Sequence, residues 1–491
     1  MDLDELINEC LTGTIDDIKF TGSIIANHLV CDYYTYCEYF IPKEEKDPES
    51  LYLQLLADKG NQHEQNVIAN LFPSAIRNTF DDNIRSFKAV LNEMLKGTKL
   101  LAGFPLYYVP EKYEGHIDLL RRSNNHSSIF GDYHYEIIEI KLAKNIKPKH
   151  IIQAIFYNEL LGRIQNYYPE NVYVINGEQK ENSHEFKKYS NDLTSIIEDI
   201  KLIKNGERKP RPAYKSCQTP WSNYNDIQAE KERDITLVPD IGKSMQKNLE
   251  NYNILKFDDL RKYDEKFLTQ IKDIGDKRAK SFKLHAEAFA EYKKIIKEPV
   301  ERLENVIEYF IDFEGVDPTL SPLDGISFDF LFGVILKNNL IEKKEFQHFI
   351  IKDPFNELEM KNVFKNFIQY LEKYSDAPVY HWGSYENTRI KKLFEIYIPG
   401  EDYSGFISRL NDLNKLVKYH YALPVYSYSV KAVAKYLGFT WRLAEMEGRM
   451  AIAKYVLYIL DEFKEESEID QIINYNEDDI EALIYIKNTL F

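Results

Sequence analysis

The sequence predicts a mixed α/β protein of several domains, with an α/β domain at each end and an all-α segment between them. The chain has 491 residues, of which 44% are hydrophobic, enough for two or three globular cores. Apolar, strand-like runs alternate with amphipathic helices in both halves, and a short repeat with a helical pattern lies in the centre. The expected domains are 1–215, 216–299 for a linker with the central helices, and 300–491.

Composition bears on the location and the partners of the chain. Its net charge of −16 argues against a general nucleic-acid-coating protein. No run approaches the roughly 18 apolar residues of a membrane span, and the N-terminus lacks the basic start and apolar core of a signal peptide. We therefore expect a soluble, cytoplasmic protein with no membrane partner. In a reducing cytosol its cysteines, Cys10, Cys31, Cys37 and Cys217, are expected to be ordinary reduced thiols.

The first expected domain carries charged side chains on two predicted strands that flank a turn rich in Ser and Asn. Asp118 ends one strand, whereas Glu139 and Lys141 lie two residues apart on the next and share a face. Carboxylates opposite an ammonium group can bind a metal ion and stabilise the charge that develops on a phosphate. On the helix that follows, Gln153 and Tyr157 lie one turn apart.

A further predicted helix starts upstream, at the stretch with Gly60 and His63. Together these residues resemble, in their order, the RecB-type nucleases of the PD-(D/E)XK superfamily. The resemblance implies a restriction-endonuclease-like α/β domain that uses Mg²⁺ or Mn²⁺. The implied metal ligands are His63, Asp118 and Glu139, and the implied catalytic groups are Lys141, Gln153 and Tyr157.

Some RecB-like nucleases close this fold with an iron–sulfur cluster held by one early and three late cysteines. Here Cys31 and Cys217 stand at matching places, and the remaining late cysteines are absent. Because such a cluster normally takes four thiolates, we do not expect an iron–sulfur cluster in this chain.

The central segment, residues 235–290, contains the same pattern twice: an apolar residue, a turn, Ile-Gly, and then an amphipathic helix. The glycines are expected to take the φ > 0 conformation of a hairpin, and each following helix N-terminus offers N–H groups to a phosphate. The pair resembles tandem helix-hairpin-helix modules, which bind the nucleic-acid backbone; the alternative is a small helical spacer. The expected nucleic-acid-binding residues are Gly242, Lys243, Gly275, Lys277 and Arg278.

Basic residues gather in this part of the acidic chain. Residues 201–220 hold six Lys or Arg against one acid, and residues 261–298 hold eleven against seven. A local basic belt of this kind suits a protein that holds phosphates in one place and cuts in another. Residues 205–215 are expected to form an exposed linker.

In the last expected domain, the apolar run at 309–316 carries Asp312 and Glu314 on one face of a strand. Neighbouring carboxylates repel unless a cation lies between them, so this strand predicts a divalent metal; the alternative is a solvated strand end. Further strands are expected at 325–336, 345–352 and 377–382, with a helix at 356–374. On the C-terminal helix Tyr475 and Asp479 share a face, unless this is only a solvated acidic face.

This arrangement resembles the ribonuclease-H-like exonucleases of the DEDD class, in the tyrosine subtype. The resemblance implies two metal ions that polarise the phosphodiester. It makes Asp312, Glu314 and Asp479 metal ligands and Tyr475 the group that orients the attacking water. Where the family has a middle aspartate, this chain offers Glu386, with Asp412 as the runner-up, and this departure puts the activity of the site in doubt.

The order of the three parts is similar to a family of bacterial RecB-like nucleases with a C-terminal ribonuclease-H-like domain. It implies a metal-dependent DNA nuclease with two candidate active sites, acting on single-stranded ends or flaps in DNA repair or in defence against mobile elements. A helicase or a defence complex is the implied partner, and RNA remains open as a substrate. The alternative is a nucleic-acid-binding scaffold or complex subunit in which one or both sites are degenerate.

Overall fold

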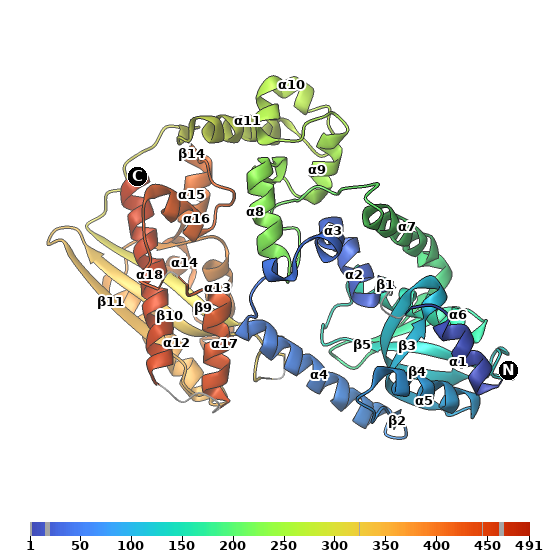
Figure 1. The fold of residues 1–491 in the computed structure, drawn as a ribbon. Coiled ribbons are helices and arrows are strands. Elements are labelled where there is room, and N and C mark those ends of the chain that lie inside the picture. Colours follow the sequence, from blue (N-terminus) through green and yellow to red (C-terminus); the bar gives the residue numbers. More distant parts are fainter. Residues whose placement is uncertain (1, 15–19, 324, 444, 461–465) are drawn as a thin grey trace. The chain divides into compact units, whose positions relative to one another are not determined.

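The structure is a computed structural model that describes residues 2–14, 20–323, 325–443, 445–460 and 466–491. The chain divides into two compact units (Figure 1). The N-terminal unit comprises Met1–Pro48 and Leu56–Gln228, and the C-terminal unit comprises Glu49–Leu55 and Ala229–Phe491. None of the described helices combines the length and the apolar composition that a membrane span requires.

The N-terminal unit is built on a seven-stranded sheet in the order β2-β3-β4-β5-β6-β7, with β1 paired to β4. Strands β3, β4 and β5 are antiparallel, whereas β5 and β6 are parallel. A parallel pair needs a crossover connection, and helix α6 supplies it. The strands are β1 (Phe20–Thr21), β2 (Ile76–Arg77), β3 (Leu100–Tyr108), β4 (Tyr113–Ser123), β5 (His134–Ile140), β6 (Asn171–Ile175) and β7 (Glu181–Glu185).

The described parts of residues 3–232 also hold eight α-helices, and α6 is buried along most of its length. They are α1 (Leu3–Leu11), α2 (Gly22–Val30), α3 (Asp32–Phe40), α4 (Leu51–Leu71), α5 (Asn83–Leu95), α6 (Pro148–Gln165), α7 (Phe186–Lys204) and α8 (Ser222–Glu232). Helix α4 begins well before Gly60, so the expectation that Gly60 and His63 mark a helix start is wrong. Glycine is tolerated inside this helix, where a Cβ at position 60 would meet nothing within 4 Å.

The expected exposed linker at 205–215 is instead packed into the N-terminal unit. Arg208 forms ion pairs with Asp32 and with Asp199, the latter at 3.2 Å. Ala213 is fully buried, and its carbonyl accepts a hydrogen bond from Asn225 Nδ2 at 2.7 Å. The expectation failed because charge composition alone does not show that an arginine has buried acids to pair with.

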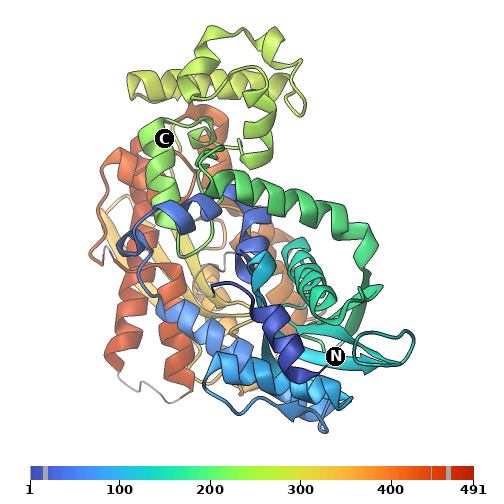
Figure 2. The same cartoon turned by 45° about the vertical axis from the view of Figure 1, so that its right-hand side comes forward.

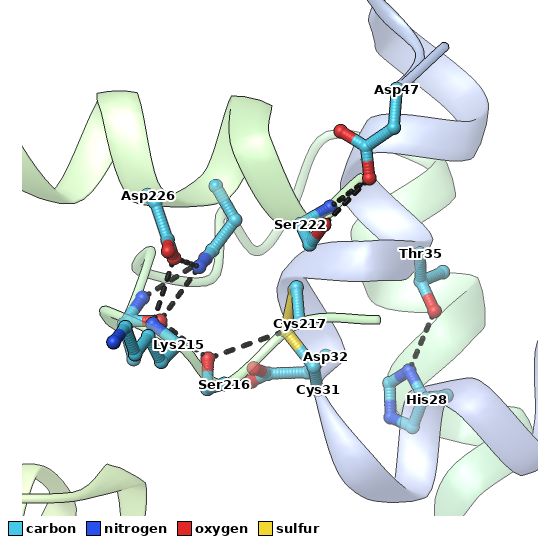
Figure 3. Close-up of a disulfide and its surroundings, with 12 residues drawn as sticks. His28, Cys31, Asp32, Thr35, Asp47, Lys215, Ser216, Cys217, Ser222 and Asp226 are labelled. Carbon is cyan, nitrogen blue, oxygen red and sulfur yellow. Dashed lines mark hydrogen bonds between the residues drawn. A yellow bond between two sulfur atoms is a disulfide. The ribbon is translucent and has the colours of Figure 1, made fainter. Parts of the chain in front are cut away.

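Cys31 and Cys217 form a disulfide between the α2–α3 junction and the segment before α8 (Figure 3). Their Cα atoms lie 5.2 Å apart, within the range that a disulfide requires. Cys10 and Cys37 are free and buried. The expectation of four reduced thiols is therefore wrong, because 186 residues of sequence separate two cysteines that the fold brings together.

The central repeat lies in the C-terminal unit, and its two copies share a backbone conformation. Gly242 caps α9 (Lys243–Glu250) with φ −96°, and Gly275 caps α11 (Asp276–Glu291) with φ −94°. The left-handed residues are Asp240 and Asp273, each with φ 69°. The expectation of positive φ at the glycines is wrong because Asp, which tolerates this region, takes the turn two residues earlier. Between the copies lies α10 (Glu265–Leu268).

A five-stranded sheet forms the core of the rest of the C-terminal unit, in the order β11-β10-β9-β12-β13. The first three strands are antiparallel, and β12 and β13 extend the sheet in parallel. The four strands and the helix expected at 309–382 are confirmed. They are β9 (Ile307–Val316), β10 (Phe328–Asn338), β11 (Lys343–Ile350), β12 (Val379–His381) and α12 (Glu357–Leu371), with β13 at Leu410–Asp412.

The C-terminal helix α18 (Glu466–Leu490) packs on β9 and β10 through Ile480, Leu483 and Ile484 (Figure 1). The view turned by 45° shows the same red helix beside the same strands (Figure 2). This packing holds the polar side chains of α18 above β9. The other elements are α13 (Tyr385–Tyr397), α14 (Ser404–Ser408), α15 (Leu413–His420), α16 (Val430–Leu437), α17 (Gly448–Ile459) and a ribbon of β8 (Ile295–Ile296) with β14 (Tyr421–Ala422).

Candidate active site and a second acidic centre

Strand β9 presents two acids from the middle of the sheet. Ile311 and Phe313 are buried on its other face, where Phe313 packs edge-on against Phe332 with ring centres 4.8 Å apart. The alternation of a strand then directs Asp312 and Glu314 to the opposite face. This is the face on which α18 packs.

Asp312, Glu314 and Asp479 form one cluster. One oxygen from each of the three carboxylates lies within 4.8 Å of the others. The structure thus brings together three of the four acids expected at this site. Tyr475, one turn before Asp479 on α18, hydrogen-bonds to Asp479 and is only 5% exposed.

The electrostatics of this cluster are unfavourable without a cation. Burial raises the pKa of Asp312 well above its usual range, and the charges of Glu314 and Asp479 raise it further. Burial and then the charge of Asp479 do the same to the pKa of Glu314, and burial raises the pKa of Asp479. Like charges held together in a buried site favour a bound divalent ion.

The donor set fits Mg²⁺ or Mn²⁺. Both are hard ions that take carboxylate oxygens as ligands. Glu386, on the first turn of α13, is 4% exposed, and its buried Oε2 has no hydrogen-bond partner. Its charge raises the pKa of both Asp312 and Glu314, so it faces the same cluster, although it lies outside the group of three. His381 Nδ1 lies 3.5 Å from Glu386 Oε2.

The runner-up for the middle acid, Asp412, has a different task. It caps helix α15, and its Oδ1 accepts hydrogen bonds from Gly383 N at 2.9 Å and Lys415 N at 3.2 Å. A carboxylate used in this way is committed to holding the local backbone. Glu386 is therefore the better candidate of the two.

Asn476 positions Asp312, and sequence reasoning missed it. Its Nδ2 donates to Asp312 Oδ2 at 2.8 Å and to the Asp312 carbonyl at 3.2 Å. Gly333 lies opposite Asp312 in the register of β10 and β9. A Cβ at Gly333 would stand 1.7 Å from Asn476 Oδ1, so only glycine leaves room for this amide. The isolated glycine in an apolar strand was the sequence feature that could have indicated this close contact.

Trp441 positions Asp479 in the same way. Its Nε1 donates to Asp479 Oδ1 at 2.6 Å. The next residue, Arg442, binds Asp478 through its Nε at 2.6 Å and through its backbone N at 2.8 Å. This clamp fixes the loop after α16 on α18, and it needs tertiary contacts that no local sequence pattern announces.

Lys431 on α16 brings a positive charge to the cluster. Its Nζ lies 4.9 Å from the centre of the Tyr475 ring and donates to the Met446 carbonyl at 2.7 Å. Its charge lowers the pKa of Glu314 and of Asp479, against the larger effect of burial. Burial also raises the pKa of Tyr475, so its hydroxyl stays protonated.

The N-terminal unit holds a second acidic centre. Asp118 lies within β4 rather than at its end, and its Oδ2 accepts from Ile140 N at 2.6 Å. Lys141, just beyond β5, donates to Glu139 Oε2 at 2.7 Å. Burial, and then the charge of Asp118, raises the pKa of Glu139 to about 8. Glu139 Oε1 is buried, and none of the described residues hydrogen-bonds to it.

Burial lowers the pKa of His63, expected as a ligand here, and its Nε2 is buried with no hydrogen-bond partner among the described residues. The next residue, Glu64, interacts electrostatically with this centre. Burial, and then the charge of Asp118, raises the pKa of Glu64 to about 7, while Lys141 lowers it. Glu64 is thus a further candidate acid beside His63, and sequence reasoning missed it.

Gln153 and Tyr157 also reach the second centre. Gln153 Nε2 donates to the Tyr157 hydroxyl at 2.9 Å, and Tyr157 has its pKa raised by burial and then by the charge of Glu139. Two glycines leave room for the tyrosine ring. A Cβ at Gly22 would lie 2.3 Å from the Tyr157 hydroxyl, and one at Gly115 would lie 2.8 Å from the ring.

The expected nucleic-acid-binding residues lie at the two helix starts of the repeat. Gly242 and Gly275 face open space, since a Cβ on either would meet nothing within 4 Å. Lys243 is the first residue of α9, and Lys277 is exposed on α11. Arg278 Nη1 instead donates to the Asp273 carbonyl at 2.7 Å, which ties it to the turn.

Residues 309–491 match the family model of the RNase H superfamily. The matched range contains the five-stranded sheet from Tyr309 onward, the cluster on β9 and α18, Glu386 and Lys431. The C-terminal residues thus form an RNase H-like domain, a fold that generally uses Mg²⁺ or Mn²⁺. The search of curated proteins finds no match to the chain.

Proposed function

We propose that this protein is a metal-dependent nuclease that hydrolyses phosphodiester bonds of DNA, with Asp312, Glu314 and Asp479 as ligands of Mg²⁺ or Mn²⁺. The convergence of these three carboxylates, of which Glu314 and Asp479 are buried and Asp312 is half-buried, carries the proposal. The RNase H-like domain supports a nuclease-type activity at the level of the superfamily. Glu386 is proposed as the fourth acid.

Divalent ions bound there supply Lewis-acid activation of the phosphodiester and of the attacking water. The chain's own residues then have distinct tasks. The protonated Tyr475 hydroxyl orients the water, as Asp479 fixes its direction. Lys431 offers positive charge to a phosphate oxygen at the edge of the cluster.

The first turn of α17 adds a second electropositive group. A Cβ at Gly448, the first residue of this helix, would lie 4.0 Å from Glu314 Oε2. The helix therefore begins beside the cluster, and its free N–H groups carry partial positive charge. Together with Lys431 they favour a phosphate over an uncharged ligand.

The second acidic centre is proposed as a further nuclease site, with Glu64, Asp118 and Glu139 as ligands and Lys141 as the assisting cation. The unpartnered Glu139 Oε1 favours this role, since a buried carboxylate oxygen is costly unless a ligand completes it. Metal binding there requires Lys141 to release Glu139. His63, whose buried Nε2 has no hydrogen-bond partner among the described residues, is proposed as a further ligand.

Cleavage of end-labelled single-stranded, duplex and flapped DNA, and of single-stranded RNA, tests the proposal. The assay compares the intact chain with Asp312→Ala, Lys141→Ala and the double variant, in Mg²⁺ or Mn²⁺. Glu481→Gln, which lies on α18 and pairs with Lys344 outside the cluster, is the matched control. Loss of cleavage with Asp312→Ala alone assigns the reaction to the RNase H-like domain.

Loss with Lys141→Ala alone moves the reaction to the N-terminal unit and leaves the RNase H-like domain as a binding module. If the intact chain binds the labelled strands and cuts none of them, the scaffold alternative replaces the nuclease. Faster cleavage of RNA than of every DNA form would overturn the choice of DNA. Repair or defence against mobile elements is the role in which ends and flaps arise as substrates.

A further inference from the structure

A pocket of about 320 Å³ lies in the C-terminal unit, away from the acidic cluster in sequence and in lining residues. Three elements line it: helix α11, the segment just after β8, and helix α15. Four of its lining residues are lysines: Lys277, Lys280, Lys297 and Lys418. Because no single helix supplies them, the tertiary structure sets their spacing.

Two contacts fix this arrangement. The β8–β14 ribbon pairs Ile296 with Tyr421, which places the segment after β8 beside the end of α15. His285 Nε2 on α11 lies 2.9 Å from the Tyr428 hydroxyl, so α11 is tied to the RNase H-like domain. Figure 1 shows α11 above β14 and α15 in this unit. The pocket is thus built where the helical repeat meets the nuclease-type domain.

The charge of the pocket is not neutralised. Among the residues that the structure describes, none of the four lysines has a carboxylate within 4.0 Å. Lys297 Nζ donates to the Lys418 carbonyl at 2.6 Å, and burial and then the charge of Lys280 lower its pKa. Glu298 is the single acid in the lining. The charges of Glu298 and Asp240 act on Lys297 less than burial and Lys280 do, so four lysines against this smaller counter-charge favour an anionic ligand.

We propose that this pocket binds a backbone phosphate of the nucleic-acid strand whose phosphodiester is cut at the acidic cluster; the identity of that strand rests on the proposed function. Lysine contacts to phosphate are independent of base sequence and set the register of the strand. Ser281, also in the lining, provides a hydroxyl donor beside the lysines. The phosphate chemistry can come from a polynucleotide backbone or from a free anion, and the backbone is the ligand proposed here.

The test is the affinity of a fluorescent single-stranded oligonucleotide, measured by anisotropy in EDTA, so that binding is read without cleavage. The Lys280→Gln/Lys297→Gln variant is compared with Lys365→Gln/Lys373→Gln, two exposed lysines on α12 and the turn after it. We expect the pocket variant to bind about fivefold to tenfold more weakly and to lower the salt slope by about 0.7, since the pocket holds one phosphate and each lost phosphate contact removes about 0.7. The control variant should keep both values.

Lys297 is half-buried, so its replacement can disturb the fold. Lys280→Gln alone, at an exposed position, is therefore the second variant and should show about half of the salt-slope effect. Lys280→Arg should restore binding, because the charge returns. Unchanged oligonucleotide affinity in a folded Lys280→Gln/Lys297→Gln variant overturns the inference.

Inorganic pyrophosphate separates the two sources of phosphate. If pyrophosphate stabilises the intact chain against thermal unfolding, loses this effect in the pocket variant, and oligonucleotide affinity is unchanged, the pocket takes a free anion and the backbone proposal is wrong. A chain that binds strands through this pocket but never cuts them would overturn the proposed function and leave the pocket assignment standing.

Discussion

In the C-terminal unit three carboxylates crowd together on β9 and α18, whereas in the N-terminal unit Glu139 has the Lys141 ammonium 2.7 Å away. Glu314, Asp479 and Glu139 are buried, and the carboxylates of both sets have raised pKa values. The first set has no cation within hydrogen-bonding distance of its carboxylates among the described residues, and Lys431 acts on it only from the edge. The second carries its own counter-charge.

This difference shows that the affinity of such a site for a metal ion depends more on the arrangement of the charges than on the number of acids. A cluster of unpaired carboxylates lowers its energy by taking a divalent cation. A carboxylate–ammonium pair must first be separated, and the free energy of this separation offsets much of the free energy gained by binding the cation. We therefore expect the RNase H-like domain to bind metal more tightly than the N-terminal unit.

The largest expected effect is the loss of cleavage in Asp312→Asn, on the order of 10²–10⁴-fold, as for removal of a group that acts in the transition state. Glu139→Gln should cost less if the two centres act separately. Initial rates on end-labelled DNA in Mn²⁺ measure both. A greater loss from Glu139→Gln than from Asp312→Asn would reverse the ranking of the two centres.

Gly333→Ala should come next, because the new Cβ would enter the space of Asn476 Oδ1 and release Asp312. We expect a loss of about 10- to 100-fold in activity, typical of losing an outer-shell partner, and roughly 1–3 kcal/mol in the free energy of unfolding. Cleavage rates measured across an Mn²⁺ titration give the activity, and urea denaturation gives the free energy of unfolding. Gly60→Ala, at a helical site with open space, is the matched control; it should leave activity near that of the intact chain and raise the free energy of unfolding by about 0.5–1 kcal/mol.

Trp441→Phe should have a smaller effect of about tenfold in metal affinity or activity, since it removes one hydrogen bond to Asp479 and keeps most of the ring packing. The variant is folded if its near-ultraviolet circular dichroism is otherwise retained. Cleavage at saturating Mn²⁺ distinguishes weakened metal binding, which high Mn²⁺ restores, from a lost catalytic arrangement. Wild-type activity at low Mn²⁺ would show that the Trp441 contact does not position Asp479.

The smallest effect concerns pH and stability in EDTA. Because the folded chain holds protons on Asp312, Glu314 and Asp479 that the unfolded chain releases, stability should fall as pH rises from about 4. Glu139 also makes stability fall with rising pH, between its ordinary pKa and about 8. Thermal unfolding from about pH 5 to about pH 8 should show a falling Tm that Asp312→Asn flattens.

Mn²⁺ should oppose this fall, and its stabilisation should grow with pH, because the metal binds the deprotonated carboxylates. A Tm that rises with pH in EDTA in the intact chain and in Asp312→Asn alike would show that these acids are not protonated in the folded state.

Local sequence patterns predicted a large part of the fold. The strand at Asp312, the long helix after β11 and the C-terminal helix follow from alternation and helical spacing, and the acids on them meet because α18 covers β9. The partners of those acids did not follow. Trp441 and Lys431 reach the acids through contacts between segments distant in sequence. The Cys31–Cys217 disulfide likewise joins segments distant in sequence.

Two smaller errors have local physical causes. The turn of the helical repeat was assigned to Gly242 and Gly275, although aspartate also tolerates the left-handed region and takes it at Asp240. Glu64 was overlooked beside His63, although its charge interacts with Asp118 and Lys141.

The most direct measurement for the central claim is calorimetric titration of the intact chain with Mn²⁺, repeated on Asp312→Asn and on Glu139→Gln. The account predicts that the tightest Mn²⁺ site disappears in Asp312→Asn and survives in Glu139→Gln. A tightest site that survives in Asp312→Asn and is lost in Glu139→Gln would contradict it and place the metal centre in the N-terminal unit.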